Sequence, residues 1–436
     1  MMWTLYELVL GLGVLVYLPK AIWRRRLPHR GWFMRLGCYP ASIRARLGKG
    51  NAVWIHAVSV GEVMAAQPLI QQLLAGDPRA PLVLSTITPA GFQVAARIVG
   101  ERGVVIFAPL DFRFALRRAL TLIQPRILLL MESELWPTWI RLTTARGIPL
   151  VVVNGRVSPR AYRRSVRVKR WLAPFVQKLD LCLMQTEVDA QRLIDMGAVK
   201  ERVKVLGNLK WDAGVSARPP QAAWETLRHR LGLQPDEPVI VAGSTHRGEE
   251  TELLNAFGAV RAGVHAARLI IAPRHLERVG EVEGLVRQRQ LAGQRTSRLL
   301  ETPGPWDVAI VDALGQLPTY YGLATVVFVG GSLIPHGGQN PIEPASLGKP
   351  VLIGPWMQNF AEITERLLSH QAAWQVHDGS ELTTHLTRLL TDGAAAAMMG
   401  RRAQALTEES LGCAQRTLDA LAPFLAPRSG PHVTSN

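Results

Sequence analysis

The segment AVWIHAVSVGEVMAAQPLIQQLL (52–74) decides the fold of this chain. Its first seven residues form an apolar run with the length and composition of a buried strand. Residues 63–74 read as a helix, and Ser59 to Glu62 connect the two. A buried strand that runs directly into a helix is the repeating unit of a parallel α/β sheet.

The same alternation continues along the chain. Val, Ile and Leu runs separated by helical stretches indicate parallel strands covered by helices on both faces. We expect further strands at 81–87, 103–109, 126–131, 148–154 and 179–185, and then a second set at 238–244, 267–273, 308–313, 324–332 and 350–355.

Two sets of strands predict two domains, and a length of 436 residues suits two domains of about 200 residues each. We expect Rossmann-like domains at 24–210 and 211–421, joined by a crossing segment rich in Ala and Pro at 207–230. The tail at 422–436 is expected to be disordered. Ligands of open parallel sheets bind outside the carboxyl ends of the strands, which predicts a site in the cleft between the domains.

Composition narrows the class of protein. Hydrophobic residues make up 48% of the chain and charged residues 19%, as in a globular protein. The cysteines Cys38, Cys182 and Cys413 are far apart, which argues against a disulfide framework or a zinc site. Neither a dinucleotide-binding G-x-G-x-x-G unit nor a P-loop motif is present. A net charge of +16 favours polyanionic partners: nucleic acid, anionic lipid or a phosphorylated substrate.

The N-terminus favours lipid among these partners. LVLGLGVLVYL (8–18) is nearly all apolar and, with its flanks, makes a stretch just long enough to span a bilayer at about 1.5 Å per residue. Basic residues follow it, with no acid between Glu7 and Glu62. By the positive-inside tendency this predicts an uncleaved anchor at 1–23, spanning or in the membrane plane, with the rest of the chain in the cytoplasm. The alternative is an N-terminal helix packed on the protein.

Three features of the first domain are candidates for function. Glu62 stands at a strand-to-helix turn, where a carboxylate either caps the helix or accepts a proton from a nucleophile. Glu132 and Glu134 follow the strand at 126–131, and one of them is free to meet a substrate if the other caps the next helix. One helical face carries a row of arginines, which is either a solvated face or a surface for anionic lipid or a phosphorylated acceptor: Arg160, Arg163, Arg164 and Arg167.

Strand ends of the second domain carry further candidates. Ser244 and Thr245 precede a helix, as an ordinary N-cap or as phosphate contacts. Arg274 and His275 offer a basic pair, and DALGQL (312–317) follows the next strand. GGSLIPHGGQNPIEPASLGKPVLIGP (330–355) reads as a ligand-gripping turn in which Glu343 is placed to accept hydrogen bonds from two ribose hydroxyls.

These motifs, in this order, resemble the bacterial 3-deoxy-D-manno-octulosonic acid (Kdo) transferases of lipopolysaccharide assembly. The resemblance rests on HAVSVGE, MESELWP, NGRVSPRAYRR, GNLKWD (207–212), GSTHRGEE, APRH and GGSLIPHGGQNPIEP, which cover residues 50–360. It implies a GT-B fold with an N-terminal acceptor domain and a C-terminal donor domain, CMP-Kdo as donor, and the bisphosphorylated lipid A precursor as acceptor. It also implies inversion at the anomeric carbon and a place on the cytoplasmic face of the inner membrane, beside anionic lipids.

Residue roles follow from the same resemblance. Glu62 is similar to the family's general base, and Glu132 with Lys210 to the pair that stabilises the transition state. The residues similar to the CMP contacts are Pro273, Arg274, Leu314, Gly315, Gln316, Asn340, Pro341, Ile342 and Glu343. Gln339 stands where members often have histidine.

Neither metal nor cofactor is expected, since there is no Asp-x-Asp motif and a monophosphate leaving group needs little neutralisation. Nucleic acid is not expected as a partner. The alternatives are a UDP-sugar-dependent lipid glycosyltransferase or nucleotide-sugar epimerase of the same architecture, and a non-catalytic, membrane-tethered protein that binds anionic lipid.

Overall fold

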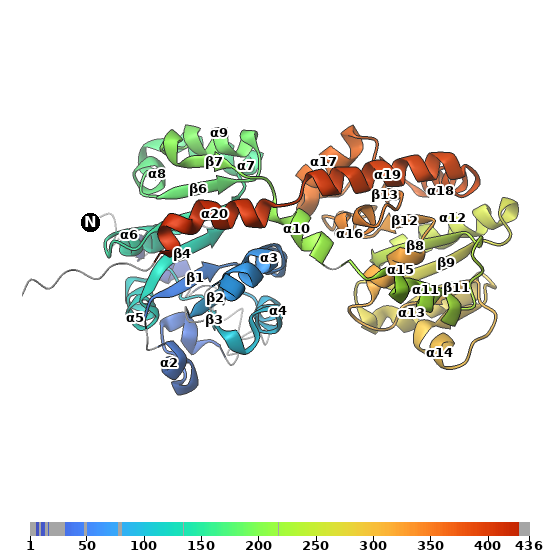
Figure 1. Ribbon diagram of the computed structural model, residues 1–436, viewed down its shortest axis with the longest axis horizontal. Coiled ribbons are helices and arrows are strands. Elements are labelled where there is room, and N and C mark those ends of the chain that lie inside the picture. Colours follow the sequence, from blue (N-terminus) through green and yellow to red (C-terminus); the bar gives the residue numbers. More distant parts are fainter. Residues whose placement is uncertain are drawn as a thin grey trace, which may run out of the picture. The chain divides into compact units, whose positions relative to one another are not determined.

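The computed structural model describes residues 6, 7, 10–13, 16, 31–47, 50–76, 81–133, 135–216 and 218–426. The chain forms two compact units (Figure 1). Unit 1 comprises Met1–Ala213 with Gly412–Asn436, and unit 2 comprises Gly214–Leu411.

Unit 1 is built on a seven-stranded parallel sheet with the order β3-β2-β1-β4-β5-β6-β7. The order reverses at the centre, where β1 pairs with β4 and His56 lies beside Leu130. The strands are β1 Ala52–His56, β2 Leu82–Thr86, β3 Gly103–Phe107, β4 Pro125–Met131, β5 Leu150–Gly155, β6 Leu181–Met184 and β7 Val203–Val205.

Helices cover both faces of this sheet, because successive side chains of a buried strand point to opposite sides. Val53 and Ile55 of β1 pack in a core with α3, α4 and α20, whereas Ala52 and Trp54 pack in a core with α5, α6, α8 and α9. The helices are η1 Phe33–Leu36, α2 Ala41–Leu47, α3 Val60–Gly76, α4 Pro89–Val99, η2 Gly100–Arg102, α5 Arg113–Ile123, α6 Pro137–Thr144, α7 Pro159–Arg167, α8 Lys169–Val176, α9 Glu187–Asp195, η3 Lys200–Arg202, α10 Leu209–Ser216 and α20 Cys413–Leu425.

Unit 2 repeats the plan with a parallel sheet of order β10-β11-β9-β8-β12-β13-β14. Here the order reverses between β8 and β12, which pair with each other from Val326 beside Ile240 to Val329 beside Gly243. The strands are β8 Val239–Thr245, β9 Arg268–Pro273, β10 Gly293–Arg295, β11 Val308–Ile310, β12 Val326–Val329, β13 Val351–Ile353 and β14 Ala373–Gln375.

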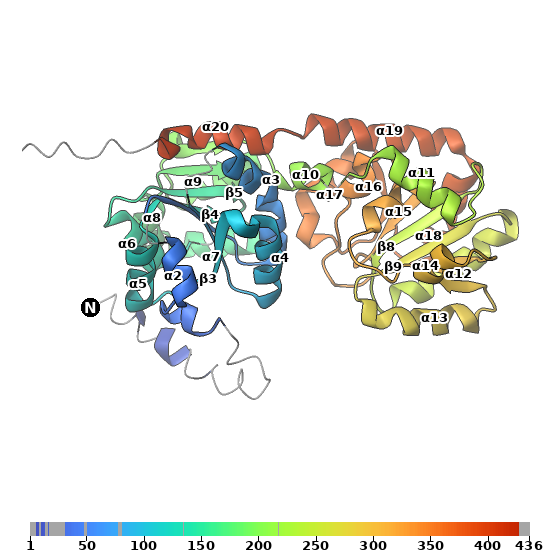
Figure 2. The same ribbon diagram turned by 60° about the horizontal axis from the view of Figure 1, so that its bottom comes forward.

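Helices again lie on both faces of the sheet in unit 2. Figure 2 shows α11 and α15 on one side of β8 and β9, and α13 on the other. The core on the α13 side also takes in α12 and α18. The helices are α11 Gln221–Arg230, α12 Glu249–Gly263, η4 Leu276–Arg278, α13 Val279–Gln288, α14 Thr296–Glu301, α15 Leu317–Leu323, α16 Ile342–Ser346, η5 Gln358–Phe360, α17 Ala361–Ser369, α18 Gly379–Thr391 and α19 Gly393–Glu409.

The fold confirms the predicted pair of doubly wound α/β units. Each of the eleven predicted strands is present, with ends shifted by a few residues. Sequence analysis missed β7, β10 and β14, which are three-residue strands at sheet edges. Side chains of β7 and β10 are partly or fully exposed, so these strands lack the apolar run that marks a buried one.

The C-terminal end of the chain departs from the predicted domain division. Helix α20 belongs to unit 1, where it packs on α3 and β4 (Figure 1), and not to the second domain. Its helical structure continues to Leu425, so residues 422–425 are not a disordered tail. Residues 427–436 lie outside the described residues. The boundary between the units falls at Ala213, three residues beyond the predicted one, within helix α10.

Most of the predicted anchor, 1–23, lies outside the described residues. Those that are described within it are helical: Tyr6, Glu7, Leu10–Gly13 and Val16. Tyr6 donates to Asp111 at 2.5 Å, and Glu7 pairs with Arg113 at 3.2 Å, so these two residues contact the start of α5 and the segment just before it. In the part of the chain that is described, no helix is long and apolar enough to cross a membrane.

Candidate functional site

The reversal of strand order in unit 1 brings two predicted catalytic carboxylates to the same edge of the sheet. Glu62 follows β1 and Glu132 follows β4, and these two strands are neighbours. Crevices at such switch points, outside the carboxyl ends of the strands, are where α/β sheets bind ligands. The fold therefore places both residues where a ligand is expected.

Glu62 is held firmly at the start of α3. Its Oε1 accepts a hydrogen bond from the Ser59 hydroxyl at 2.9 Å, and its Oε2 accepts one from the Val58 N–H at 2.8 Å. The Ser59 oxygen in turn accepts from the Glu62 N–H at 3.3 Å. These reciprocal bonds resemble a capping box, so Glu62 does cap the helix. Its side chain is nearly buried, with a relative exposure of 9%, and its orientation is fixed.

Glu132 and Lys210 form an ion pair, with 3.3 Å between Oε1 and Nζ. Both side chains are mostly buried, which strengthens the attraction between the charges relative to a surface pair. Glu132 adopts the left-handed conformation with a φ of 53°, while its N–H donates to Val153 O. A non-glycine residue in this conformation costs free energy, and such strain is concentrated at functional sites. Glu134 lies outside the described residues.

A buried amide network holds the backbone that carries Lys210. The Asn208 side chain donates to Gln185 Oε1 at 3.1 Å and accepts from the Lys210 N–H at 3.0 Å. Asn154, at the end of β5, accepts from the Leu209 N–H at 2.9 Å and has a φ of 56°. Sequence analysis did not single out these amides, although two of them lie in the motifs NGRVSPRAYRR and GNLKWD.

The last residue of GNLKWD has a structural task. Asp212 accepts hydrogen bonds from the Gly412 and Ala414 N–H groups, at 2.8 and 2.9 Å, and so caps the N-terminus of α20. These two hydrogen bonds connect α10 to the start of α20, although the two segments are about 200 residues apart in the sequence. They explain why α20 belongs to unit 1.

The predicted arginine surface is exposed. Helix α7 has no buried residue, and its four arginines point away from the core: Arg160, Arg163, Arg164 and Arg167. Beside them Val166, Val168 and Trp171 expose 40, 49 and 66% of their surface. Basic side chains next to an exposed tryptophan are typical of a surface that meets anionic lipid.

In unit 2 the switch point lies between β8 and β12, and the loops that follow these strands meet there. The Gly330 N–H donates to Gly243 O at 2.8 Å. A Cβ at Gly330 would come within 2.5 Å of Ser244 O and 2.6 Å of the Thr245 Cα. Only glycine permits this approach, which brings the glycine-rich turn against the end of β8.

The two predicted phosphate contacts on β8 differ in accessibility. Ser244 is half-buried, with a φ of 55°. Thr245 is fully buried, and its hydroxyl donates to Glu250 Oε1 at 3.0 Å. Because the only proton of that hydroxyl is already used, the phosphate contact predicted for Thr245 does not fit the structure.

Glu249 binds the two loops together, and sequence analysis missed this role. Its fully buried carboxylate accepts from the backbone N–H of His246 at 2.9 Å, and from those of Gly331, Ser332 and Leu333 at 2.7, 2.9 and 3.0 Å. Burial raises the pKa of Glu249, while these hydrogen bonds oppose the rise. The motif GSTHRGEE contains it, but its two acids read from sequence as a favourable first helical turn.

The predicted ribose-binding turn is ordered by its own side chains. Asn340 Nδ2 donates to Glu343 Oε1 at 3.0 Å, and Asn340 Oδ1 accepts from the Ile342 N–H at 3.0 Å. Pro341 precedes helix α16, which begins at Ile342. Burial raises the pKa of Glu343 to about 7. The carboxyl group is thereby oriented by Asn340 and half-buried.

The remaining predicted donor contacts lie at other carboxyl ends of the same sheet. Pro273 is buried at the end of β9, and Arg274 after it is exposed while its N–H donates to Thr245 O. Leu314, Gly315 and Gln316 form an exposed turn before α15, and Gly315 has a φ of 79°. The structure thus collects these residues at one edge of unit 2.

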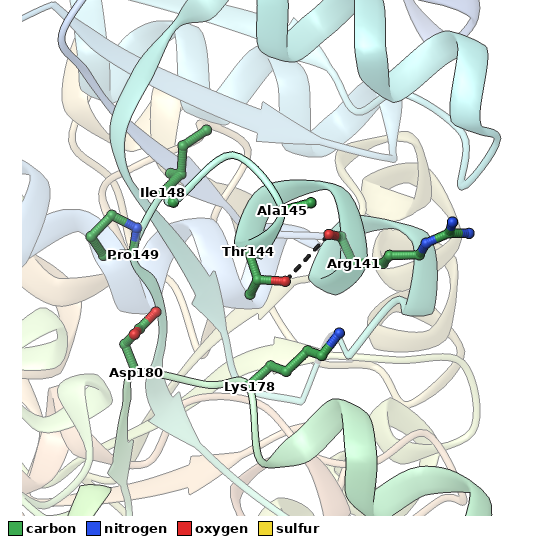
Figure 3. Close-up of a pocket in the computed structure, with 8 residues that line it drawn as sticks. Arg141, Thr144, Ala145, Ile148, Pro149, Lys178 and Asp180 are labelled. Carbon is green, nitrogen blue, oxygen red and sulfur yellow. Dashed lines mark hydrogen bonds between the residues drawn. The ribbon is translucent and has the colours of Figure 1, made fainter.

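A pocket of about 520 Å³ lies elsewhere in unit 1 (Figure 3). Arg141 and Thr144 at the end of α6, Pro149 before β5, and Lys178 and Asp180 before β6 line it. These positions precede the strands, so the pocket lies at the edge opposite to Glu62 and Glu132. It contains no predicted site residue.

The chain is similar to proteins of known family. The family model described as 3-deoxy-D-manno-octulosonic-acid transferase (kdotransferase) matches residues 30–213. The UDP-GlcNAc 2-epimerase from Neisseria meningitidis, solved with UDP-GlcNAc, is similar in structure with a TM-score of 0.59 over 85% of this chain and 100% of that one. At 13% identity this likeness shows the fold alone, a GT-B-like pair of parallel seven-stranded sheets.

Two sequence relatives cover almost the whole chain. The 3-deoxy-D-manno-octulosonic acid transferase of Haemophilus influenzae is 32% identical, over 92% of both chains. That of Bordetella pertussis is 35% identical, over 96% of this chain and 99% of its own. With this identity over nearly its full length, the chain belongs to the 3-deoxy-D-manno-octulosonic acid transferase family.

Proposed function

We propose that the chain is an inverting glycosyltransferase that moves Kdo from CMP-Kdo to the lipid A precursor. The observation that carries this proposal is the Glu132–Lys210 ion pair at the switch point of unit 1, in a chain that belongs to the Kdo transferase family. Glu62 stands at the same edge of the sheet.

Unit 1 supplies the chemistry on the acceptor. A glucosamine hydroxyl of the lipid A precursor attacks the anomeric carbon of Kdo and gives its proton to the Glu62 carboxylate. The new C–O bond forms as the bond between the anomeric carbon and the phosphate oxygen breaks, and CMP leaves with the bonding electrons. Lys210, held by Glu132, stabilises the negative charge that develops in this step.

Unit 2 holds the donor. The Glu343 carboxyl, aimed by Asn340, accepts hydrogen bonds from the ribose hydroxyls. Arg274, exposed after β9, provides positive charge for the phosphate, together with the backbone N–H groups at the glycine-rich turn. Pro273, Pro341, Ile342 and the turn at 314–316 complete the contacts to CMP.

The membrane provides the acceptor. We propose that the chain works on the cytoplasmic face of the bacterial inner membrane, with residues 1–23 as its anchor. The exposed arginines of α7 beside Trp171 support this, because anionic lipid attracts clustered basic residues by about 1 kcal/mol each.

Incubation of the full chain with CMP-Kdo and the lipid A precursor, followed by mass spectrometry of the lipid, tests the proposal. A lipid heavier by one or more Kdo units supports it. The fold likeness to a UDP-GlcNAc 2-epimerase favours a UDP-sugar enzyme as the second candidate. Thermal protection of the protein by UDP but not by CMP would favour that candidate.

A further inference from the structure

Three histidines gather at the switch point of unit 2, and each comes from a different strand end. The ring of His246, after β8, lies 3.9 Å from the ring of His336 in the glycine-rich turn after β12. The same ring lies 5.8 Å from that of His275, after β9. We call these three residues the histidine cluster.

The centre of the histidine cluster is fixed in place. His246 has only 6% of its surface exposed. Its Nε2 lies 3.2 Å from Gln339 Nε2, so the amide orients the ring. Its backbone N–H is bound by the Glu249 carboxylate, which also binds three N–H groups of the turn that precedes His336. The geometry is therefore built by buried contacts, whereas His275 and His336 are exposed.

The surroundings of the histidine cluster are electropositive. The pKa of His246 is lowered to about 4, first by burial and then by His336, His275, Arg274 and Arg278. The nearby acids are engaged: Glu249 by backbone N–H groups, and Glu250 by Arg278 at 2.7 Å and by Thr245. Glu277 lies 3.8 Å from His275 Nδ1, and both of these side chains are more than half exposed.

We propose that the histidine cluster, together with Arg274, forms a binding site for an oxyanion of the donor. We call this binding site the seat. Imidazole and guanidinium groups gathered at three neighbouring strand ends suit a phosphate or a carboxylate, since each provides charge-assisted hydrogen bonds. CMP-Kdo carries both anions next to the reacting carbon. The name of the donor rests on the proposed function, but the chemistry of the seat does not.

Anion binding at this seat is coupled to proton uptake. An anion favours the charged form of a neighbouring imidazole and so raises its pKa. Burial and the neighbouring positive charges lower the pKa of His246 to about 4, and an anion bound beside the ring opposes this shift, so anion binding favours proton uptake by the histidine cluster.

Calorimetry of the full chain with four probes tests the seat: inorganic phosphate, CMP, CMP-Kdo and cytidine. The variants are His336→Ala and His275→Ala, since both residues are exposed and their removal leaves the core intact. His265→Ala, an exposed histidine at the turn before β9, is the matched control. Thermal unfolding shows that each variant is folded.

We expect each cluster variant to bind CMP about tenfold more weakly, while its affinity for cytidine equals that of the wild type. This result assigns the seat to the phosphate. An unchanged affinity for CMP with a weakened affinity for CMP-Kdo assigns the seat to the sugar carboxylate. The control should bind every probe as the wild type does.

The number of protons taken up on binding is a further measurement, and it would not change if the histidines had only a structural role. Binding heats measured at pH 7 in buffers of different ionisation enthalpy should show protons taken up by the wild type and fewer by each cluster variant. The seat is refuted if both variants bind phosphate, CMP and CMP-Kdo like the wild type, or if the wild type binds none of them. Histidine-dependent anion binding without any transfer of Kdo would refute the proposed function and leave the seat standing.

Discussion

Lys210 Nζ lies 3.3 Å from Glu132 Oε1, although 78 positions separate the two residues in the sequence. Both side chains are mostly buried, so each charge depends on the other for its compensation. The pair joins the strained residue after β4 to the first turn of α10, at the edge of the sheet where Glu62 also stands.

Removing either member of the pair should abolish the same contribution to catalysis. We expect Lys210→Met and Glu132→Gln each to lower kcat by about 100-fold or more, since an electrostatic contact to developing charge is worth about 3 kcal/mol. The double variant should be little worse than the single ones, because groups that act as a unit are not additive. Steady-state kinetics measure this, with the exposed Lys200→Ala as control. Effects that multiply would show that the residues act separately.

Variants of Glu62 and Ser59 distinguish two roles of Glu62, which are the capping of α3 and the acceptance of a proton as general base. Glu62→Gln should lower kcat by about 100-fold to 10,000-fold, because an amide cannot accept the proton. Ser59→Ala removes the reciprocal bonds and should destabilise the fold by about 1 kcal/mol while transfer falls only a few-fold. Measurements of turnover and of thermal unfolding for both variants distinguish capping from catalysis. If Glu62→Gln retains wild-type turnover, Glu62 is a cap and not a base.

The raised pKa of Glu343 makes the stability of unit 2 depend on pH. Its folded pKa of about 7 exceeds the ordinary value of 4.5, so between these values the folded state holds more protons than the unfolded state. Stability from this group is therefore greatest below pH 4.5 and is lost as pH rises through 7. Glu343→Gln should raise the thermal midpoint at pH 8 by more than at pH 5.5. An equal change at both pH values would contradict a carboxyl that titrates near 7.

The arginines of α7 should control attachment to anionic membranes. We expect Arg163→Gln with Arg167→Gln to weaken binding to vesicles that contain anionic lipid by about 30-fold, at about 1 kcal/mol for each charge. Binding to neutral vesicles should not change. Sedimentation with vesicles measures both, and Arg287→Gln with Arg401→Gln removes the same charge from exposed positions of unit 2. Equal losses in the two double variants would show that only net charge matters.

The fold was predictable from sequence wherever a strand is buried on both faces. The run at 126–131 became β4, whose seven residues are all buried. The short edge strands β7, β10 and β14 gave no such signal, because they lack an apolar run and pairing with a neighbour defines them. Likewise, α20 has the pattern of an ordinary helix, and nothing local shows that Asp212 caps it.

Site residues were predictable from sequence where a residue with suitable chemistry follows the end of a predicted strand, as Glu62 and Glu132 do. The long-range contacts were not predictable from the chemistry of single residues. The bond from Thr245 to Glu250 excludes a phosphate contact that position alone suggested. Asn154 was predicted as the last residue of a strand and Asn208 as part of the segment between the domains, and only the fold places their amides on the backbone that carries Lys210.

Mass spectrometry of the lipid A precursor after incubation with CMP-Kdo tests the central claim most directly. Wild-type protein should give a lipid heavier by one or more Kdo units, and Lys210→Met should give about 100-fold less of this product in the same time while it binds CMP as tightly as the wild type. An unchanged lipid mass with folded wild-type protein, or full transfer by Lys210→Met, would contradict the account.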